Sequence, residues 1–336
     1  MIHQAYAVES SASYAAQSSS GGAFMAILSE VFKTNKDVVV YGVELFHGHE
    51  VRYSEATTLK ECERFRGSKY VESSILSLRE EIKNRLEDGK YVVVSGLPCQ
   101  VYALDKYLSS CEISKSNLLL IDLLCHGTPP NKIWRDYVEW LEKKYRSTLI
   151  DYSFRYKPAK WQNYPAMASF QNGKTVINSM EVRMFNSLFL SDLIMRECCY
   201  SCTFANTARV GDITLADFWG IREVLPEYKP SGAVSLVLSN TDKADSLLEL
   251  LSKENNTKMM RCNNSDYIKY QHNLNKPVDR PEKRDVFLED YNNKGFDYCV
   301  RKYMKYSVLG KCKFFLKKVL NEIGLVEFLR NRRIIR

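Results

Sequence analysis

Two apolar runs, each followed directly by a segment with helical spacing, constrain the fold of this chain most strongly. Residues 91–95 read Tyr-Val-Val-Val-Ser, and the helix expected after them reaches residue 108. A second apolar run covers residues 118–124, and a helix is expected over residues 131–145. Repeated strand-then-helix units are typical of a parallel or mixed sheet that binds ligands at the carboxyl ends of its strands. The sequence therefore predicts an α/β fold of the mixed α+β kind.

Antiparallel structure is expected after residue 150. Three short segments, 154–157, 166–170 and 174–177, have the pattern of an antiparallel β meander with Gln-Asn-Gly at one turn. Near the N-terminus, His47-Gly48 separates two apolar runs and predicts a hairpin turn.

The expected domain division follows the change from strand–helix units to antiparallel strands after residue 150. Residues 1–260 form the expected main domain, with a parallel-type half (1–149) and a half (150–260) that holds the meander and a Cys-x-x-Cys pair. Residues 261–336 are expected to be a polar linker and a basic C-terminal helix, and residues 255–281 are polar enough to predict irregular structure.

Composition places the chain among folded globular proteins rather than disordered or membrane-spanning ones. It has 336 residues, of which 45% are hydrophobic and 26% charged. No apolar run reaches the roughly 18 residues that a membrane span needs. The N-terminus does not show the pattern of a signal peptide, so a cytoplasmic location is expected.

The C-terminal segment carries most of the excess positive charge. Residues 301–336 contain eleven Lys or Arg against two Glu, interleaved with apolar residues. This pattern predicts an amphipathic basic helix that makes peripheral contact with an anionic membrane surface or an acidic partner. The alternative is a terminal helix packed on its own domain with a solvated cationic face. Nucleic acid is not an expected partner, because no stacking platform or binding motif accompanies the charge.

Four of the ten cysteines are placed to hold one metal centre. Cys99 and Cys125 each follow one of the two predicted strands, while Cys199 and Cys202 form a Cys-x-x-Cys pair. A reducing compartment disfavours disulfides, and four thiolates suit either an iron–sulfur cluster or a tetrahedral zinc ion. Spacing alone leaves both open. Cys198 adjoins Cys199 and ranks below it, because Cys199 has the required spacing to Cys202.

A loop of small residues before a predicted helix suits a phosphate group. Its hydroxyls and free amides are typical of phosphate sites at helix N-termini, although an ordinary helix cap explains the same residues. Lys69 and Tyr70 supply a cation and an aromatic ring that could face a nucleotide. His126, beside Cys125, is a candidate proton donor or hydrogen-bond partner of a metal-bound sulfur. These candidates are Ser18, Ser19, Ser20, Gly21, Gly22, Lys69, Tyr70 and His126.

Taken in order, several segments resemble the coenzyme F420-reducing hydrogenase and dehydrogenase beta subunit family. The resemblance covers about residues 15 to 240. The segments that carry it are Ser-Ser-Ser-Gly-Gly-Ala-Phe from residue 18, Gly-Ser-Lys-Tyr-Val from 67, Ser-Gly-Leu-Pro-Cys-Gln-Val from 95, Asp-Leu-Leu-Cys-His-Gly-Thr-Pro from 122, Phe-Arg-Tyr-Lys from 154, Cys-Tyr-Ser-Cys-Thr-Phe from 199 and Gly-Asp-Ile-Thr-Leu-Ala-Asp-Phe-Trp-Gly from 211.

The resemblance implies a flavin-binding mixed α/β fold that moves electrons between FAD, with FMN as the alternative, and a 4Fe-4S cluster. It implies that Cys99, Cys125, Cys199 and Cys202 ligate the cluster. It also implies that the loop 18–22, with Lys69 and Tyr70, lines the flavin site. His126 is then the candidate catalytic group.

The resemblance also implies redox partners. Many relatives begin with a ferredoxin-like module, and this chain starts just before the Ser-Ser-Ser-Gly-Gly loop, so a separate ferredoxin-type protein is the expected electron donor or acceptor. The small-molecule partner is expected to be a deazaflavin or a sugar intermediate, since short relatives resemble proteins found beside bacterial polysaccharide-assembly enzymes. Two other interpretations are a zinc-stabilised scaffold in a glycan-assembly complex and a transferase with Cys99 as nucleophile and His126 as base.

Overall fold

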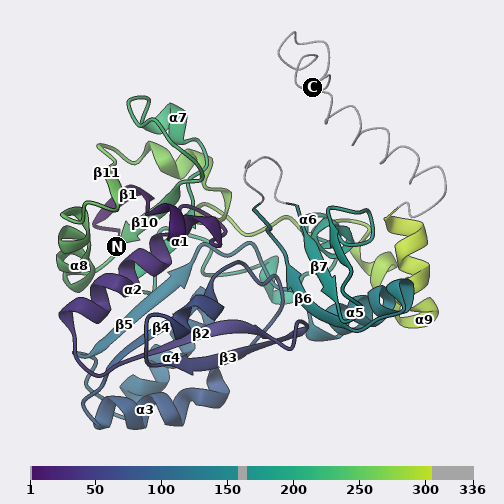
Figure 1. The fold of residues 1–336 in the computed structure, drawn as a ribbon, viewed down its shortest axis with the longest axis horizontal. Coiled ribbons are helices and arrows are strands. Elements are labelled where there is room, and N and C mark those ends of the chain that lie inside the picture. The colour runs from purple at the N-terminus through teal and green to yellow at the C-terminus, as the bar shows by residue number, and fades with distance from the viewer. Residues whose placement is uncertain (1, 158–164, 305–336) are drawn as a thin grey trace.

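An eight-stranded mixed sheet forms the framework of the larger of two packed units (Figure 1). The computed structural model describes residues 2–157 and 165–304. The strands lie in the order β11-β1-β10-β9-β5-β4-β2-β3. Their bounds are β1 Gln4–Glu9, β2 Val38–Phe46, β3 Glu50–Ala56, β4 Tyr91–Gly96, β5 Leu118–Leu123, β9 Ile213–Asp217, β10 Ser235–Ser239 and β11 Lys258–Arg261.

Five strands of this sheet run in the same direction. Neighbours β2, β4, β5 and β9 pair in parallel. Strand β10 is antiparallel to both β9 and β1, so β1 has the direction of β9. The carboxyl ends of β1, β2, β4, β5 and β9 therefore meet at one edge of the sheet. We call this the carboxyl edge.

Helices cover both faces of the large sheet, because the central strands are apolar on both sides. Strand β4 buries Val92, Val93 and Val94 completely, which is the pattern of a strand inside a parallel sheet. Helices α2 (Ala23–Thr34) and α8 (Asp242–Ser252) pack on one face. Helices α3 (Arg79–Glu87) and α4 (Pro98–Ser110) pack on the other. The result is a three-layer unit that holds its strand ends rigidly.

The smaller unit is built on an antiparallel sheet of three strands and an aromatic core. The strands β6 (Leu149–Ser153), β7 (Met167–Phe170) and β8 (Thr175–Ile177) pack with α5 (Asn131–Tyr145), α6 (Met184–Leu190) and α9 (Arg284–Tyr303). Trp134 lies at the centre, with its ring centroid 4.9 Å from that of Phe185 and 5.0 Å from that of Phe154. These aromatic contacts hold α5 and α6 against the small sheet.

The hairpin between β2 and β3 joins the two units. His47 and Gly48 adopt left-handed backbone conformations with φ of 48° and 76°. A Cβ on Gly48 would lie 2.1 Å from the carbonyl carbon of Ile150, so only glycine fits there. The Trp134 indole N–H donates to the His49 carbonyl over 2.5 Å. The hairpin tip is therefore fastened to the small unit.

Most of the predicted fold is confirmed. The mixed α/β fold, both strand–helix units, the His47-Gly48 hairpin and the meander are present. The first meander strand was placed wrongly, because β6 ends at Ser153 and residues 154–157 follow it. Residues 255–281 are not wholly irregular, since β11 lies within them. The predicted basic helix over residues 301–336 lies almost wholly outside the described residues, and residues 301–303 form the end of α9.

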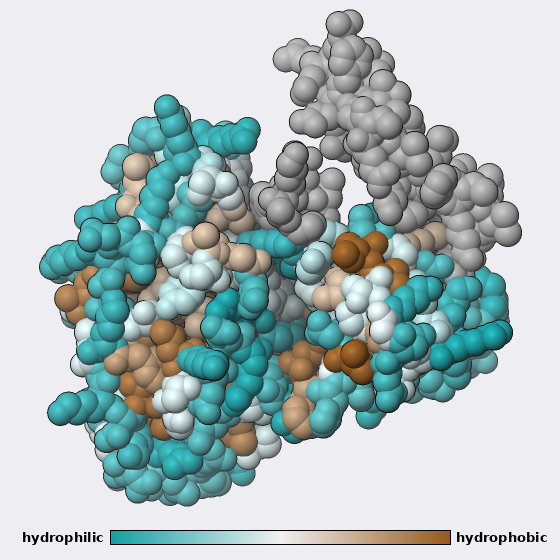
Figure 2. Space-filling view, in the orientation of Figure 1, coloured by the Kyte–Doolittle hydropathy of each residue, from teal (hydrophilic) through white to brown (hydrophobic). Residues whose placement is uncertain are grey.

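The sheet combines strands from both sides of residue 149, because β9, β10 and β11 join strands of the N-terminal part. None of the described helices is long and apolar enough to span a membrane. Hydrophilic residues cover most of the face seen in Figure 2, and apolar residues form small patches on it. The remaining short helices are α1 Ala12–Ala16, η1 Glu61–Phe65, η2 Ile75–Leu78, η3 Glu197–Cys199, α7 Ile221–Val224, η4 Asp266–Tyr270 and η5 His272–Leu274.

Candidate functional site

The four candidate metal ligands come from three chain segments that meet at the carboxyl edge. Cys99 is the second residue of α4, directly after β4. Cys125 follows the end of the neighbouring parallel strand β5. Cys199 ends the short helix η3, and Cys202 lies in the turn that follows. The sheet topology thus brings cysteines that are a hundred residues apart in sequence to one place.

Three of these thiols have pKa values raised by burial and by neighbouring cysteines, with Cys198 among the neighbours of Cys99 and Cys199. Burial, together with the charges of Cys199, Cys99 and Cys202, raises the pKa of Cys125 to about 12. Burial likewise raises the pKa of Cys99, with Cys202 as the next cause, and the pKa of Cys199 to about 11. Cys99 is exposed at the surface of the site, and Cys125, Cys199 and Cys202 are half-buried. Thiols that repel one another when ionised form an environment that a bound cation stabilises. The donor set therefore fits a thiolate-bound metal centre.

Backbone contacts hold the Cys125 loop against the Cys199 turn. The Arg196 amide donates to the Thr128 carbonyl over 3.1 Å, and the Cys199 Sγ lies 4.0 Å from the same oxygen. Gly127 lies between the two segments with φ of 134°. A Cβ there would lie 3.4 Å from the Cys199 Cβ and 3.0 Å from the Met195 Sδ. Glycine at this position permits the close approach of the two cysteine-bearing loops.

A buried ion pair fastens the segment after Cys202 to β5. The Asp122 and Arg209 side chains are 0% and 1% exposed, and their charged atoms are 2.6 Å apart. Arg209 also donates to the Phe204 and Asn206 carbonyls. Asp122 lies three residues before Cys125, so this pair fixes one ligand segment relative to another. It was missed in the sequence, because a lone Arg gives no sign of a partner 87 residues away.

The four thiols do not form a compact metal-binding group among the described residues. In tetrahedral zinc sites the Zn–S distance of about 2.3 Å places the sulfurs roughly 3.8 Å apart. Among residues 2–157 and 165–304, the one group of three or more ligand atoms within 4.8 Å of one another contains no cysteine. The residue types suit either an iron–sulfur cluster or a zinc ion.

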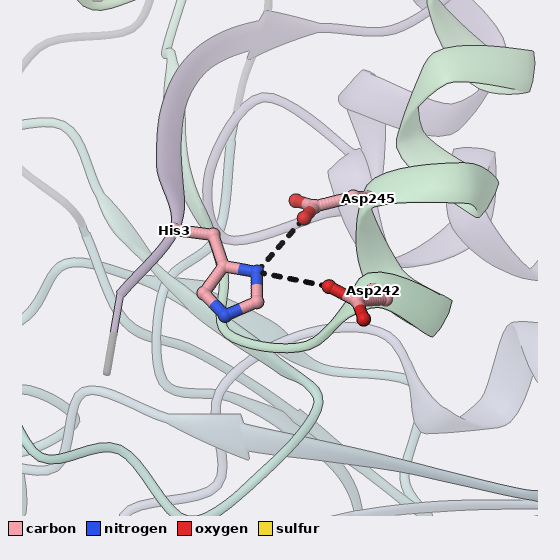
Figure 3. A group of neighbouring side chains, drawn as sticks. All are labelled: His3, Asp242 and Asp245. Atoms are coloured by element: carbon pink, nitrogen blue, oxygen red, sulfur yellow. Dashed lines mark hydrogen bonds and ion pairs between the residues drawn. The ribbon is translucent and has the colours of Figure 1, made fainter.

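That compact group is His3, Asp242 and Asp245 (Figure 3). The His3 Nδ1 lies 2.8 Å from an Asp245 carboxylate oxygen and 3.8 Å from one of Asp242. Both acids belong to the first turn of α8, where negative charge suits the helix dipole. The Ser239 hydroxyl also donates to Asp245 over 2.6 Å. These contacts fasten the start of β1 to α8, which accounts for the group without a metal.

The Ser-Gly loop lies at the same edge, after β1, and is held from two sides. The Ser19 hydroxyl accepts hydrogen bonds from the Ser68 amide and hydroxyl over 2.6 and 2.8 Å. Ser20 donates to the Val234 carbonyl over 2.8 Å, and the Gly21 amide donates to a hydroxyl at the start of β10. A Cβ on Gly21 would lie 2.3 Å from a β1 carbonyl oxygen. The loop is thus pinned in one conformation.

Cations surround this loop, and two of them have lowered pKa values. Lys69 donates to the Arg66 carbonyl over 2.7 Å, and burial lowers its pKa to about 7. Lys157 donates to the Ser20 carbonyl over 2.5 Å, and burial, followed by the Arg155 charge, lowers its pKa to about 8. Arg66 donates to the carbonyl of residue 13 at the start of the same loop region. Such a set of cations suits a phosphate or diphosphate group.

Residues from the small unit complete this region. Arg155 and Lys157 follow β6, and Arg155 forms an ion pair of 2.6 Å with Asp217 at the end of β9. The segment 154–157 was singled out in the sequence, but its two cations were not identified as site residues. Their i, i+2 spacing, which places both on one side of an extended segment, is the signal that could have found them.

An aromatic contact connects the two sites. The Tyr70 ring stacks on Phe189 with centroids 4.3 Å apart, and Phe189 lies 5.2 Å from the His126 ring. His126 adjoins Cys125, and its Nε2 is 2.7 Å from an Asp192 carboxylate oxygen. Tyr70 follows Lys69 beside the Ser-Gly loop. The structure therefore brings both His126 and Tyr70 into contact with one phenyl ring.

Comparisons with known proteins identify the family of this chain and agree with its fold. The family model for the C-terminal part of the coenzyme F420 hydrogenase/dehydrogenase beta subunit matches residues 89–264, more than half of the chain. No curated protein matches. A solved structure of the F420-reducing [NiFe] hydrogenase complex from Methanosarcina barkeri, determined with xenon derivatization, resembles the fold with a TM-score of 0.56 and 14% identity, covering 87% of this chain and 93% of that one. The chain belongs to the coenzyme F420 hydrogenase/dehydrogenase beta subunit family.

Proposed function

We propose that this protein is an electron-transfer oxidoreductase that holds a 4Fe-4S cluster and a flavin side by side at the carboxyl edge of its large sheet. The observation that carries the proposal is the convergence of four thiols there, in a chain that belongs to this family. Carboxyl ends of parallel strands are the usual ligand sites of such sheets.

Cys99, Cys125, Cys199 and Cys202 would hold the cluster. A 4Fe-4S cluster bound by four cysteine thiolates supplies single-electron transfer. The chain's part is to hold the thiols in place: Gly127 lets two ligand loops approach, and the Asp122–Arg209 pair ties a third segment to β5. Fixed ligands are what such a site requires, since the protein positions and tunes the cofactor.

The loop 18–22 would hold the phosphate end of the flavin, FAD in our proposal with FMN as the alternative. Lys157 directs its ammonium group at the Ser20 carbonyl of the loop, and Lys69 directs its own at the Arg66 carbonyl, in the segment whose Ser68 bonds Ser19. An anionic phosphate would hydrogen-bond these cations better than neutral carbonyls do. Tyr70, stacked on Phe189, would line the ring end of the site.

His126 is the proposed catalytic group for proton exchange. Asp192 accepts a hydrogen bond from its Nε2 when that nitrogen carries the proton, which fixes the orientation of the imidazole ring. The Phe189 ring packs beside it and keeps bulk water from one side. His126 would thus hold a proton between the cysteine site and Tyr70.

The partners follow from this chemistry. We propose a ferredoxin-type protein as electron donor or acceptor, and a deazaflavin or a sugar intermediate as the small-molecule substrate, the latter in bacterial polysaccharide biosynthesis. The protein would work in the cytoplasm, with peripheral contact at the inner membrane face through the basic C-terminal segment.

The test is the cofactor content of protein purified without oxygen. Iron, acid-labile sulfide, zinc and flavin are measured per chain, together with the visible spectrum. About four irons and four sulfides with one flavin support the proposal. Zinc alone, with no colour, overturns it and leaves the scaffold role.

Cysteine variants make the same test specific to the ligands. Cys99→Ser, Cys125→Ser, Cys199→Ser and Cys202→Ser should each lose iron. Cys262→Ser is the matched control, because Cys262 is a buried thiol in a different core cluster. Equal iron content in ligand and control variants would contradict the ligand assignment.

A further inference from the structure

Arg284 reaches the Cys-x-x-Cys turn from outside the segment that the family model matches. It is the first residue of α9, twenty residues beyond the end of that segment at 264. The residue is 7% exposed. Its guanidinium group faces the stretch 195–200, which contains Cys199 and lies just before Cys202.

All three guanidinium nitrogens bind within this stretch. Nη2 donates to the Met195 carbonyl over 2.9 Å, and Nε donates to the Tyr200 hydroxyl over 3.0 Å. Nη1 forms an ion pair of 2.8 Å with Glu197. The guanidinium carbon also lies 5.1 Å from the centroid of the Tyr200 ring. A planar group with fixed donors holds three points at once, which a lysine cannot do.

The helix that carries Arg284 is itself anchored. Gly295 has a non-helical backbone conformation and divides α9 into two stretches. Phe287 and Tyr291, in the stretch that carries Arg284, are buried in the core of the small unit. The guanidinium therefore stands on a rigid support rather than on a free segment.

Neighbouring Arg280 provides a comparison. It contacts the same Glu197 over 2.8 Å and also Asp285, but both of these are exposed carboxylates. Its side chain is 36% exposed, against 9% for that of Arg284. Exposed ion pairs of this kind stabilise little. Arg280 thus shares the charge of Arg284 and its contact with Glu197, while the hydrogen bonds to Met195 and Tyr200 belong to Arg284.

We propose that Arg284 is a positioning residue for the metal ligands. It fixes the turn 195–200, and with it the direction in which Cys199 and Cys202 face Cys99 and Cys125. Arg284 also contacts Tyr200, whose hydroxyl donates to the Asp192 carbonyl. Asp192 is the residue whose carboxylate bonds His126, so Arg284 supports this contact as well. The identity of the bound group rests on the proposed function, whereas the positioning of the thiols does not.

The experiment compares Arg284→Met, Arg284→Lys and Arg280→Met with the wild type. In reduced, iron-free protein, the rate at which iodoacetamide alkylates each cysteine is followed by peptide mass spectrometry. We expect Cys199 and Cys202 to react faster in Arg284→Met by on the order of tenfold. The loss of hydrogen bonds from a charged group makes local opening of the turn 195–200 more frequent by about this factor. Arg284→Lys should be intermediate, and Arg280→Met should match the wild type.

Unchanged rates at Cys199 and Cys202 in a folded Arg284→Met protein overturn the proposal. So does a rise of equal size at Cys111, which lies at the far end of α4 and reports general loosening. If Arg284→Met does not fold, Tyr200→Phe, which removes one of the three acceptors, decides by the same measurement.

A second measurement uses iron-loaded protein. The electron paramagnetic resonance spectrum of the reduced cluster should broaden in Arg284→Met, recover partly in Arg284→Lys and stay unchanged in Arg280→Met. If the wild type binds no iron, the proposed function fails, and the alkylation rates still decide the role of Arg284.

Discussion

The cysteine site and the Ser-Gly loop lie at the same edge of one sheet, yet they have opposite chemistry. The cysteine site gathers neutral thiols whose pKa values are raised, so its ligands must lose protons to bind a metal. The loop gathers ammonium groups whose pKa values are lowered, so its cations must keep their protons to bind an anion. Burial causes both shifts, because it disfavours the charged form of either group. The two sites therefore offer opposite charge: the cysteine site offers thiolates to a cation, and the loop offers ammonium groups to an anion.

The largest effect is expected from the ion pair that supports the cysteine site. Arg209→Met should lower the free energy of unfolding by about 3 to 5 kcal/mol, because it leaves the Asp122 carboxylate buried without its partner. Urea denaturation at neutral pH measures this. The double variant with Asp122→Asn should lose clearly less than the sum of the two single changes. Additive losses would show that the two groups do not act as a pair.

Variants of the cations at the Ser-Gly site should weaken ligand binding. Lys157→Met and Lys69→Met should each weaken flavin binding by about 1.5 to 3 kcal/mol, roughly tenfold to a hundredfold in Kd, because each removes a hydrogen bond to a charged group. Fluorescence titration of the flavin-free protein measures this. Lys106→Met, on the exposed side of α4 near Cys99, is the control. An equal loss in the control would remove the distinction between the two sites.

A change of pH should move the two sites in opposite directions. Lys69 and Lys157 carry charge below their pKa values of about 7 and 8, so anion affinity is full at lower pH and falls as pH rises through this range. Metal uptake by the thiols releases protons, so it should improve over the same range. Flavin affinity and iron reconstitution, measured between roughly pH 6.5 and 8.5, test this. In Lys69→Arg the flavin affinity should depend less on pH, while the pH dependence of iron reconstitution should stay as in the wild type.

The same lysines give a stability effect with a definite sign. In the unfolded chain a lysine stays protonated up to about pH 10.4, whereas folded Lys69 loses its proton near pH 7. Between these values the unfolded state binds more protons, so flavin-free protein should become more stable as pH rises. Lys69→Met should reduce this slope. A slope that is the same in both proteins would contradict the lowered pKa.

The smallest effect is expected at the His3 group, which resembles a metal site in geometry only. His3→Ala should cost at most about 1 kcal/mol, because the ion pairs are exposed. Thermal unfolding with and without added Zn²⁺ should show the same difference between wild type and variant. A Zn²⁺-dependent stabilisation that His3→Ala abolishes would show a metal site away from the cysteines.

The sequence predicted the parts of the molecule whose signals are local. The runs around Val93 and Leu119 are apolar enough to indicate central strands, and cysteine has few roles in a reducing compartment, which singled out Cys99 and Cys125. Strand β11 was missed because it is a short edge strand with only Met259 and Met260 as apolar residues.

Site residues with distant partners were also beyond local patterns. Arg209, Lys157 and Arg284 are ordinary surface-type residues in the sequence, and they acquire roles only through groups 84 to 137 residues away. Charged residues are common and mostly solvated, so no single-sequence pattern separates these from the rest. Their partners can be identified only once the topology of the sheet is known.

The place of β1 in the sheet has a consequence for how the protein is made. Gln4 in β1 pairs with Ser239 in β10, and β11 closes the other side of β1. At a synthesis rate of about 5 to 20 residues per second, this N-terminal strand waits on the order of 10 to 50 seconds for its neighbours to leave the ribosome. The Ser-Gly loop that follows it is pinned to β10 and stays unformed for the same time. The Ser-Gly loop therefore reaches its folded conformation only after residue 239 has been synthesised.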